Sequence, residues 1–326
     1  MELIDSFGRR INYLRLSVTD RCNLRCSYCM PAEGVEKLAH GDILSYEDLF
    51  RIARAAVAIG IEKIRITGGE PLVRKGIVPF LARIAAIEGL RHLVLTTNGL
   101  LLPEMAADLR SAGVQRLNIS LDSLRADTFR AITRTGELQR VLDGIAAADA
   151  AGFPPPKINM VVMRGINDGE VTDFARLTMD RPCTVRFIEY MPATRENNWQ
   201  SLTVPGREIL DRISASYELE PVEKGACAGP SRDFRIRGAA GTLGVITAVS
   251  GHFCGDCNRV RVTSTGMAKS CLFSDEGFDL RPFLDTGDPI ILQEALRRIV
   301  GVKPERHGMS ARKAEHQAFS MAKIGG

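Results

Sequence analysis

Short strand-like runs alternate with helical patterns over the first two-thirds of this 326-residue chain. Repeated strand–helix units are typical of a parallel sheet, so the alternation predicts an α/β fold. Six units fit a partial, TIM-like (βα)6 barrel better than a complete eight-unit barrel. A doubly wound open sheet stays the alternative, because periodicity does not decide whether a sheet closes. The predicted strands cover residues 13–18, 63–67, 92–97, 116–121, 157–163 and 184–190.

The helices predicted between these strands have clear start and stop signals. The clearest covers residues 45–59, where Ser45 and Asp48 form an acidic version of the capping box and Gly60 is the stop signal. Two more are predicted from about 103 to a stop at Gly113, and from 137 to 151 before Gly152.

The pattern changes after about residue 192. Residues 193–205 are polar, and shorter predicted elements follow them. We therefore divide the chain into a barrel, 1–192, which carries a first metal site, and a smaller C-terminal α+β region, 193–326, which carries a second. This region is expected to pack on the barrel. Its predicted helices are 206–214 and 289–300, and its predicted strands are 234–237, 243–249 and 259–263.

Composition excludes several classes of protein. Hydrophobic residues make up 45% and charged residues 25%, as in soluble globular proteins. No apolar run approaches the ~18 residues that cross a bilayer, and the N-terminus has no apolar run like that of a signal peptide, which points to the cytoplasm. The net charge of +4 is too small to predict nucleic-acid binding. We expect neither a membrane nor a nucleic acid as partner.

Cys22, Cys26 and Cys29 form the first of two groups of three cysteines. A reducing compartment disfavours disulfides, and soft thiolates favour iron–sulfur clusters or zinc. A [4Fe–4S] cluster normally takes four ligands, so three leave one iron open for a small molecule. A structural zinc ion wants four protein ligands, and no His is close by in the sequence. The group predicts an iron–sulfur site, with a zinc knuckle or chance cysteines as the alternative.

Cys254, Cys257 and Cys271 form the second group. One interpretation is a zinc ribbon with His252 as the fourth ligand. The other is a second cluster whose open iron could hold a substrate. Two cysteines, Cys183 and Cys227, belong to neither group and are expected to be plain thiols.

The first cysteine group, with Tyr28 before its third cysteine, resembles the signature of the radical S-adenosylmethionine (SAM) superfamily. The run 68–71, Gly-Gly-Glu-Pro, resembles a second feature of that superfamily. With the second cysteine group, the pattern is similar to the GTP 3′,8-cyclase family of molybdenum cofactor biosynthesis over almost the entire chain. The supporting segments are 16–22, 65–71, 96–99, 120–123, 157–159, 186–191 and the terminal Gly325-Gly326, whereas 226–237 matches only loosely.

The resemblance implies two [4Fe–4S] clusters, one on each cysteine group, with SAM at the open iron of the first. The residues implied for SAM are Tyr28, Gly69, Ser120 and Met191. Those implied for GTP are Arg15, Arg65, Thr96, Lys157, Arg259 and Arg261, with Lys63 and Arg186 as further candidates. Gly325 and Gly326 are expected to reach into the active site, although a Gly-Gly end could also be a frayed terminus.

The chain contains no GxxxxGK[ST] phosphate loop. A triphosphate would therefore have to be bound by side-chain cations, for which Arg offers bidentate bonds and Lys a point charge. The alternative for any one of these cations is a solvated surface charge without a ligand. The alternative for Met191 is ordinary core packing.

The resemblance also implies the reaction, which is that of a lyase. A reduced first cluster cleaves SAM to a 5′-deoxyadenosyl radical, which takes hydrogen from C3′ of GTP. The C3′ radical attacks guanine C8 and gives 3′,8-cyclo-7,8-dihydro-GTP, while the second cluster holds the guanine near N1. Implied partners are GTP, a reductant such as flavodoxin or ferredoxin, and a downstream cyclic pyranopterin monophosphate synthase. A homodimer is left open.

Two other functions compete with this interpretation. One is a different radical SAM enzyme with an auxiliary cluster, such as a peptide-modifying enzyme. The other is a non-enzymatic zinc protein that binds nucleic acid, against which the modest charge and the lack of a dense basic run argue.

Overall fold

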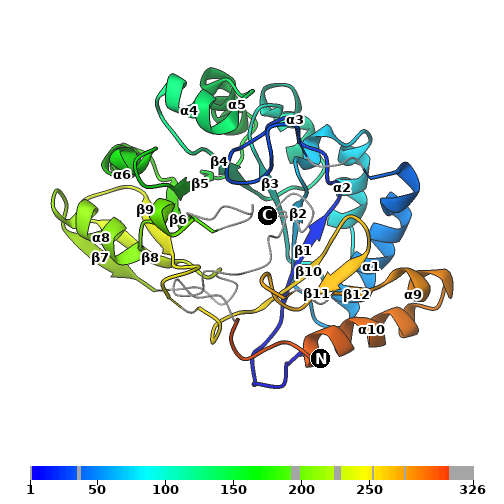
Figure 1. Ribbon diagram of the computed structural model, residues 1–326. Coiled ribbons are helices and arrows are strands. Elements are labelled where there is room, and N and C mark those ends of the chain that lie inside the picture. The colour runs from blue at the N-terminus through cyan, green and yellow to red at the C-terminus, as the bar shows by residue number, and fades with distance from the viewer. Residues whose placement is uncertain are drawn as a thin grey trace.

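A single curved sheet runs through the molecule, with helices on its outer side (Figure 1). The structure is a computed structural model that describes residues 2–34, 38–191, 199–223, 229–251, 253–274 and 277–307. Within these ranges no helix combines the length and the apolar character needed to cross a membrane.

The first part of the chain builds six strands that pair in parallel in chain order. All six strands predicted for this part, and the three helices for which we predicted both ends, are confirmed to within one or two residues at each end. The elements are β1 (Tyr13–Ser17), η1 (His40–Asp42), α1 (Tyr46–Ala58), β2 (Lys63–Thr67), η2 (Pro71–Val73), α2 (Ile77–Ala85), β3 (His92–Thr97), α3 (Leu102–Ser111), β4 (Arg116–Ser120), α4 (Ala126–Thr133), α5 (Leu138–Ala150), β5 (Lys157–Val162), η3 (Asp168–Glu170), α6 (Val171–Asp180) and β6 (Thr184–Glu189).

The C-terminal region continues the same sheet at both edges. Its strand β9 pairs in parallel with β6, and β10 pairs in parallel with β1, so eight parallel strands follow one another. The region thus contributes strands to the barrel sheet as well as helices outside it. Its elements are α7 (Trp199–Leu202), α8 (Gly206–Ser214), β7 (Leu219–Val222), β8 (Arg232–Ile236), β9 (Thr242–Ile246), β10 (Arg259–Val262), β11 (Met267–Lys269), β12 (Phe278–Asp279), α9 (Arg281–Asp285) and α10 (Pro289–Gly301).

The sheet order is β12-β11-β10-β1-β2-β3-β4-β5-β6-β9-β8-β7. Its two ends are β12 and β7, and no pairing joins them in the described ranges, so the barrel is partial. The outer strands β11, β12, β7 and β8 are antiparallel to their neighbours. The division at 192 stays a prediction, because strands on both sides of it share one sheet.

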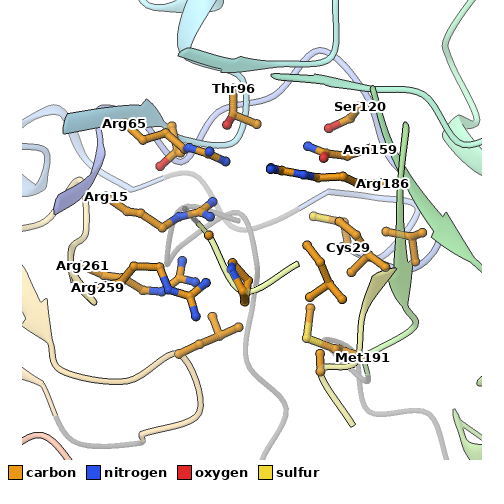
Figure 2. A pocket seen from close by; sticks show the side chains of 18 of the residues that line it. Arg15, Cys29, Arg65, Thr96, Ser120, Asn159, Arg186, Met191, Arg259 and Arg261 are labelled. Carbon is orange, nitrogen blue, oxygen red and sulfur yellow. The ribbon is translucent and has the colours of Figure 1, made fainter. Parts of the chain in front are cut away.

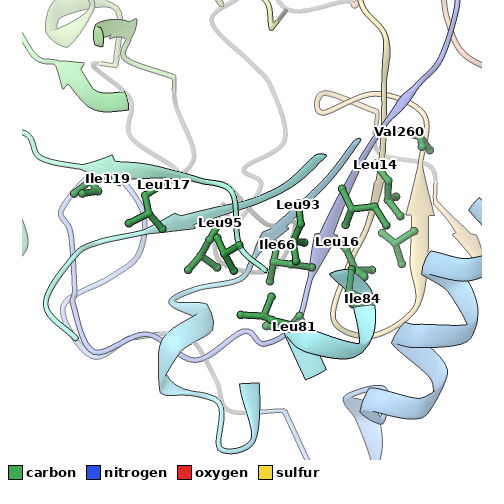
Figure 3. Packing of buried hydrophobic residues seen from close by; sticks show 14 of the residues in the cluster. Leu14, Leu16, Ile66, Leu81, Ile84, Leu93, Leu95, Leu117, Ile119 and Val260 are labelled. Carbon is green, nitrogen blue, oxygen red and sulfur yellow. The ribbon is translucent and has the colours of Figure 1, made fainter. Parts of the chain in front are cut away.

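Each parallel strand has one apolar and one polar face. On β1, Leu14 and Leu16 are completely buried and point outward to the helices, while Arg15 between them points inward. Figure 3 shows Leu14 and Leu16 gathered with the side chains of α2. Burying a leucine in this way contributes roughly 1.5–3 kcal/mol, so the outward face holds the fold together. The inward face is left available for polar side chains.

The start of α1 follows its sequence signal with one difference. Ser45 Oγ accepts a hydrogen bond from Asp48 N at 3.0 Å, which confirms the cap. The Asp48 carboxylate accepts from the Ser45 hydroxyl at 2.7 Å, whereas a capping box would have it accept from the Ser45 main-chain N–H. The helix ends at Ala58, two residues before Gly60, whose φ of 113° requires glycine.

Candidate active site

One cavity of about 280 Å³ lies inside the curved sheet, and both cysteine groups line it. The six predicted ligands form two groups that are more than 200 residues apart in the chain and meet here. All seven cysteines in the described ranges are free of disulfides. The predicted ligands that line the cavity are Cys22, Cys26, Cys29, Cys254, Cys257 and Cys271. Cys227, His252, Gly325 and Gly326 lie outside the described residues.

The first cysteine group lies in the loop after β1. A turn brings Cys29 N to within 2.9 Å of Cys26 O, and Cys22 Sγ accepts from Leu24 N at 3.3 Å. Burial raises the pKa of the Cys22 thiol to about 11. A buried thiol in such a place is a poor nucleophile, whereas a bound metal would deprotonate it outright.

The donor chemistry of the cysteines suits a cluster more than a single metal ion. In the part of the chain that the structure describes, no three Cys, His, Asp or Glu side chains converge closely enough to hold one metal ion. In an iron–sulfur cluster each thiolate binds a different iron, so the sulfurs stand farther apart than around a single ion. Three thiols per group, all lining one cavity, are a suitable donor set for a cluster with one open iron.

The Gly-Gly-Glu-Pro run packs against the segment that leads into the first cysteine group. A Cβ on Gly69 would lie 2.5 Å from Arg21 O, and one on Gly68 would lie 2.7 Å from Thr19 O. Gly69 N also donates to Thr19 O at 2.8 Å. The glycines thus permit a close approach of two main-chain segments. The Gly69 N–H is used within the protein, and the role of Gly69 at SAM stays a prediction.

Glu70 anchors this loop to the end of β3. Its carboxylate accepts hydrogen bonds from Leu72 N, from Thr97 Oγ1 and from Asn98 N, the last at 2.7 Å. Burial raises the pKa of Glu70 to about 7, although these three bonds oppose the rise. Asn98 Nδ2 in turn donates to Asn23 Oδ1 at 2.7 Å, next to Cys22.

Tyr28 and Asp122 connect the first cysteine loop to the far side of the cavity. The Tyr28 hydroxyl donates to Asp122 Oδ2 at 2.8 Å, and Asp122 Oδ1 accepts from Val161 N at 2.9 Å. Burial raises the pKa of Asp122 to about 6. The other residues expected at SAM, Gly69, Ser120 and Met191, line the same cavity.

In the second cysteine group, Cys254 and Cys257 lie in the loop between β9 and β10, and Cys271 lies just after β11. Arg259 Nη2 approaches Cys257 Sγ at 3.6 Å, and Arg9 Nη1 donates to Cys254 O at 2.8 Å. Burial raises the pKa of the Cys257 thiol, but Arg259 and Lys303 more than offset this and bring it down to about 6. This group therefore has a cationic surrounding that suits thiolates.

Cations from different strands meet inside the sheet. Arg15 lies in register with Arg261 on β10 and with Arg65 on β2. Across the cavity, Arg186 on β6 lies in register with Asn159 on β5. Figure 2 shows these side chains pointing toward a common space, with Thr96 and Ser120 above it.

These cations repel one another in a buried setting. Burial lowers the pKa of Arg15, and Arg261 and Arg65 lower it further. Burial and Arg259 lower the pKa of Arg261 to about 10. In the described ranges, the Nε atoms of Arg65 and Arg186 have no hydrogen-bond partner. Buried polar groups normally have partners, so the cavity is suited to a ligand with several negative charges.

Lys157 differs from the other cations predicted for GTP. It shares the inward face of β5 with Asn159, two residues later, but it does not line the cavity. Burial, with Arg186 and Lys63 nearby, lowers the pKa of its amine to about 7. The other residues predicted for GTP, Arg15, Arg65, Thr96, Arg259 and Arg261, all line the cavity.

Several lining residues were not singled out from the sequence. Asn159 could have been found, because it lies two residues after Lys157 and strand residues two apart share a face. Arg186, a further candidate only, is 6% exposed and lines the cavity. No local signal points to Arg9 or Lys303, which reach the cavity from the two ends of the described chain.

Comparison with known proteins gives two adjoining family matches. Residues 16–178 match the radical SAM superfamily, and residues 183–309 match the family described as Molybdenum Cofactor Synthesis C. The chain is 98% identical, over the full length of both, to a GTP 3′,8-cyclase of Geobacter sulfurreducens. It is 47% identical to a GTP 3′,8-cyclase of Moorella thermoacetica, over 99% of each chain.

Solved structures show the same fold at low sequence identity. Streptococcus suis SuiB bound to the precursor peptide SuiA matches 88% of this chain with a TM-score of 0.59 and 16% identity. This chain spans 66% of the SuiB chain in that complex. The protein anSMEcpe with bound AdoMet matches 81% of this chain and 75% of its own, with a TM-score of 0.54 and 13% identity.

Proposed function

Because the chain belongs to the radical SAM superfamily and, within it, to the GTP 3′,8-cyclase family, we propose that it joins C3′ of GTP to guanine C8 in the first step of molybdenum cofactor biosynthesis. One observation carries the proposal: two three-cysteine groups and a set of buried cations line one cavity. The full-length identity to GTP 3′,8-cyclases favours this activity over the peptide-modifying alternative.

The two cysteine groups would each hold a [4Fe–4S] cluster. Cys22, Cys26 and Cys29 would hold the first, and the second group, Cys254, Cys257 and Cys271, would hold another. When bound, the first cluster and SAM supply the 5′-deoxyadenosyl radical that takes the C3′ hydrogen. The cationic surrounding of Cys257 supports thiolate ligation at the second group.

The buried cations would bind the triphosphate of GTP. Arg15, Arg65 and Arg261 would form charge-assisted hydrogen bonds to phosphate oxygens, which would relieve their mutual repulsion. Arg186 and Thr96 face the same space and would complete the set, together with Arg259 beside the second cysteine group. Lys157, which does not line the cavity, would act on them as a point charge from outside the lining.

SAM would lie near the first cysteine group. Tyr28 is held by Asp122, so its ring is fixed next to the cysteines, and Ser120 and Met191 face it from β4 and from the end of β6. The main chain at Gly69 would contribute through its carbonyl group, because its N–H is used by Thr19. Holding both reactants in one geometry is a large catalytic effect for a ring closure.

We further propose the setting in which the protein works. Free cysteines support a reducing compartment such as the cytoplasm. A reductant such as flavodoxin or ferredoxin would supply the electron, and a cyclic pyranopterin monophosphate synthase would take the product. The tail residues Gly325 and Gly326 would reach the active site.

Anaerobic iron and sulfide analysis, followed by an assay with GTP and SAM on the same sample, tests the proposal. Two clusters predict about eight irons per chain. Product should contain a C3′–C8 bond and should depend on a reductant. Arg259→Ala should cut GTP turnover and leave the iron content unchanged. Full turnover in that variant would remove Arg259 from the site, and absence of cyclised product in the wild type would overturn the activity.

A further inference from the structure

Two buried cations hold the main chain around the second cysteine group. Arg9 donates through Nη1 to Cys254 O at 2.8 Å and to Glu305 O at 3.0 Å, and through Nη2 to Pro304 O at 2.7 Å. Lys303 Nζ donates to Ser270 O at 2.6 Å and to Arg259 O at 3.0 Å. We call these two side chains, with the five carbonyl oxygens they bind, the carbonyl clamp.

The clamp reaches the main chain at or beside every cysteine of the second group. It binds the carbonyl of Cys254 itself, that of Arg259, two residues after Cys257, and that of Ser270, directly before Cys271. The pairing of β10 with β11 ends at Arg261 and Lys269, short of Arg259 and Ser270, and no pairing in the described ranges reaches Cys254. Lys303 therefore extends the link between these strands, and Arg9 ties Cys254 to the segment that follows α10.

Both cations are built into the fold. The Arg9 side chain is 8% exposed, and its Nε donates to the fully buried Asp5 carboxylate at 2.6 Å. Asp5 also accepts from the main-chain N–H groups of Phe7 and Arg9, each at 2.9 Å. The guanidinium is thus oriented from behind, which fixes the direction of its other donors.

Lys303 is 4% exposed, yet within the described ranges it has no carboxylate partner. Burial lowers the pKa of its amine, and Cys257 and Cys271 nearby oppose that fall. A buried cation is costly unless anions are near it, and thiolates at these positions would supply them. Ser6 Oγ adds a further contact, to Gly301 O at 2.5 Å, so the N-terminal segment lies along the end of α10 (Figure 1).

The first cysteine group has a comparable arrangement made of different residues. Arg25 Nη1 donates to Cys22 O at 2.7 Å, and Arg134 Nη1 donates to Arg25 O and Met30 O, each at 3.0 Å. Among the described residues, Arg134 is the only one other than glycine with a positive φ, 64°. Such a conformation persists where surrounding contacts require it. Each cysteine loop is therefore held by its own cations.

We propose that Arg9 and Lys303 are positioning residues that keep the second cysteine group in shape for its cluster, independently of the first group. The inference rests on the proposed second cluster. Loss of either side chain frees the main chain at one or more cysteines, so the metal should dissociate faster. Arg134 should have the same role at the first group only.

Full-length chains that keep one group each make the test specific. Replacing Cys22, Cys26 and Cys29 by Ala leaves a second-site protein, and replacing Cys254, Cys257 and Cys271 by Ala leaves a first-site protein. Arg9→Gln, Lys303→Met and Arg134→Gln are introduced separately into both. After anaerobic reconstitution, iron per chain and the rate of iron release to a ferrous chelator are measured.

We expect Arg9→Gln and Lys303→Met to speed release from the second-site protein by about 10- to 100-fold, the usual effect of losing a partner around metal ligands. They should not change release from the first-site protein, whereas Arg134→Gln should show the opposite pattern. Arg9→Lys keeps the charge but not the planar guanidinium group, and should give an intermediate rate of iron release. If circular dichroism shows that Arg9→Gln does not fold, the rate measured for Arg9→Lys provides the test.

Unchanged release from the second-site protein in folded Arg9 and Lys303 variants would overturn the inference. Faster release from both proteins would also overturn it, because that is the sign of general destabilisation. Failure of the second-site protein to bind iron with Arg9 and Lys303 intact would contradict the second cluster itself, and the clamp with it.

Discussion

Arg15 on β1 and Arg261 on β10 lie opposite each other in register on parallel strands and line the same cavity. Arg261 is buried and Arg15 is half-buried, and Arg261 is the neighbour that lowers the pKa of Arg15 most after burial itself. Two like charges in this position oppose folding, and an anion between them would remove the cost. The binding site is therefore a source of instability in the protein without nucleotide.

This relationship predicts the behaviour of Arg261→Met. The nucleotide-free variant should be more stable than the wild type, by about 1 to 4 kcal/mol, because a buried charge is replaced by an apolar side chain of similar size. The rise in Tm caused by GTP should be lost. Calorimetry with and without GTP measures both effects. Arg207→Met, at a side chain that is 92% exposed, is the matched control and should alter neither. A variant less stable than the wild type without GTP would contradict the argument.

Lys157→Met should change how stability depends on pH. Burial lowers the pKa of Lys157 to about 7 from its ordinary 10.5, so between these values the unfolded chain binds a proton that the folded protein does not. The free energy of unfolding of the wild type must therefore rise with pH in this window. The variant should be the more stable protein below pH 7, and its advantage should shrink as the pH approaches 10.5. Urea unfolding across this range measures the difference, and a constant difference would be the contrary result.

Cys22→Ala should abolish SAM cleavage, because a loop with two cysteines should not hold its cluster. The measurement is 5′-deoxyadenosine formed per chain under reducing conditions. Cys183→Ala is the matched control: Cys183 is buried beside Leu177, away from the cavity, and its loss should leave SAM cleavage intact. Normal 5′-deoxyadenosine output from Cys22→Ala would rule out the assignment of the first group.

Gly69→Ala should impair the first site through the main chain. The added Cβ would lie 2.5 Å from Arg21 O and 2.8 Å from Asp20 O, so the segment leading to Cys22 must move. We expect a large loss of SAM cleavage with a clear fall in Tm. Gly169→Ala, where a Cβ would meet nothing within 4 Å, should behave like the wild type. Equal activity of the two variants would show that the loop tolerates the displacement.

Deletion of Gly325 and Gly326 should stop product formation while the iron content stays at its wild-type value. The expected reason is that the tail reaches into the active site, where residues without side chains fit a narrow space. Product analysis and iron analysis on the same sample separate the two effects. A truncated protein with full activity would mean that the tail has no part in the reaction.

The strands were predictable because each carries its own signal. Leu14 and Leu16 alternate with Arg15, and this period of two appears in the sequence without knowledge of any neighbour. The pairing of β1 with β10 was not predictable, because no local pattern states which strand lies beside a given edge. We therefore predicted a C-terminal region that packs on the barrel, and did not predict that its strand β10 pairs with β1.

The site was predictable to the extent that its residues lie in recognisable segments. The cysteine groups and most of the cations do, and the structure brings them to one cavity. The position of Lys157 outside the cavity lining and the use of the Gly69 N–H inside the protein depend on register and loop packing, which the segments do not contain. Arg9 and Lys303 bind main-chain carbonyl groups. Every residue has such a group, so the sequence does not indicate which ones are bound.

The pairing of β1 with β10 also has a consequence for synthesis on the ribosome. Tyr13 lies opposite Arg259, so the first strand to emerge waits for a neighbour that is made some 240 residues later. Contacts so distant in the chain slow folding, and an unpaired strand edge is open to wrong partners in the meantime. The nascent barrel has an exposed edge for most of its translation, and a shortened chain that ends before β10 keeps that edge permanently.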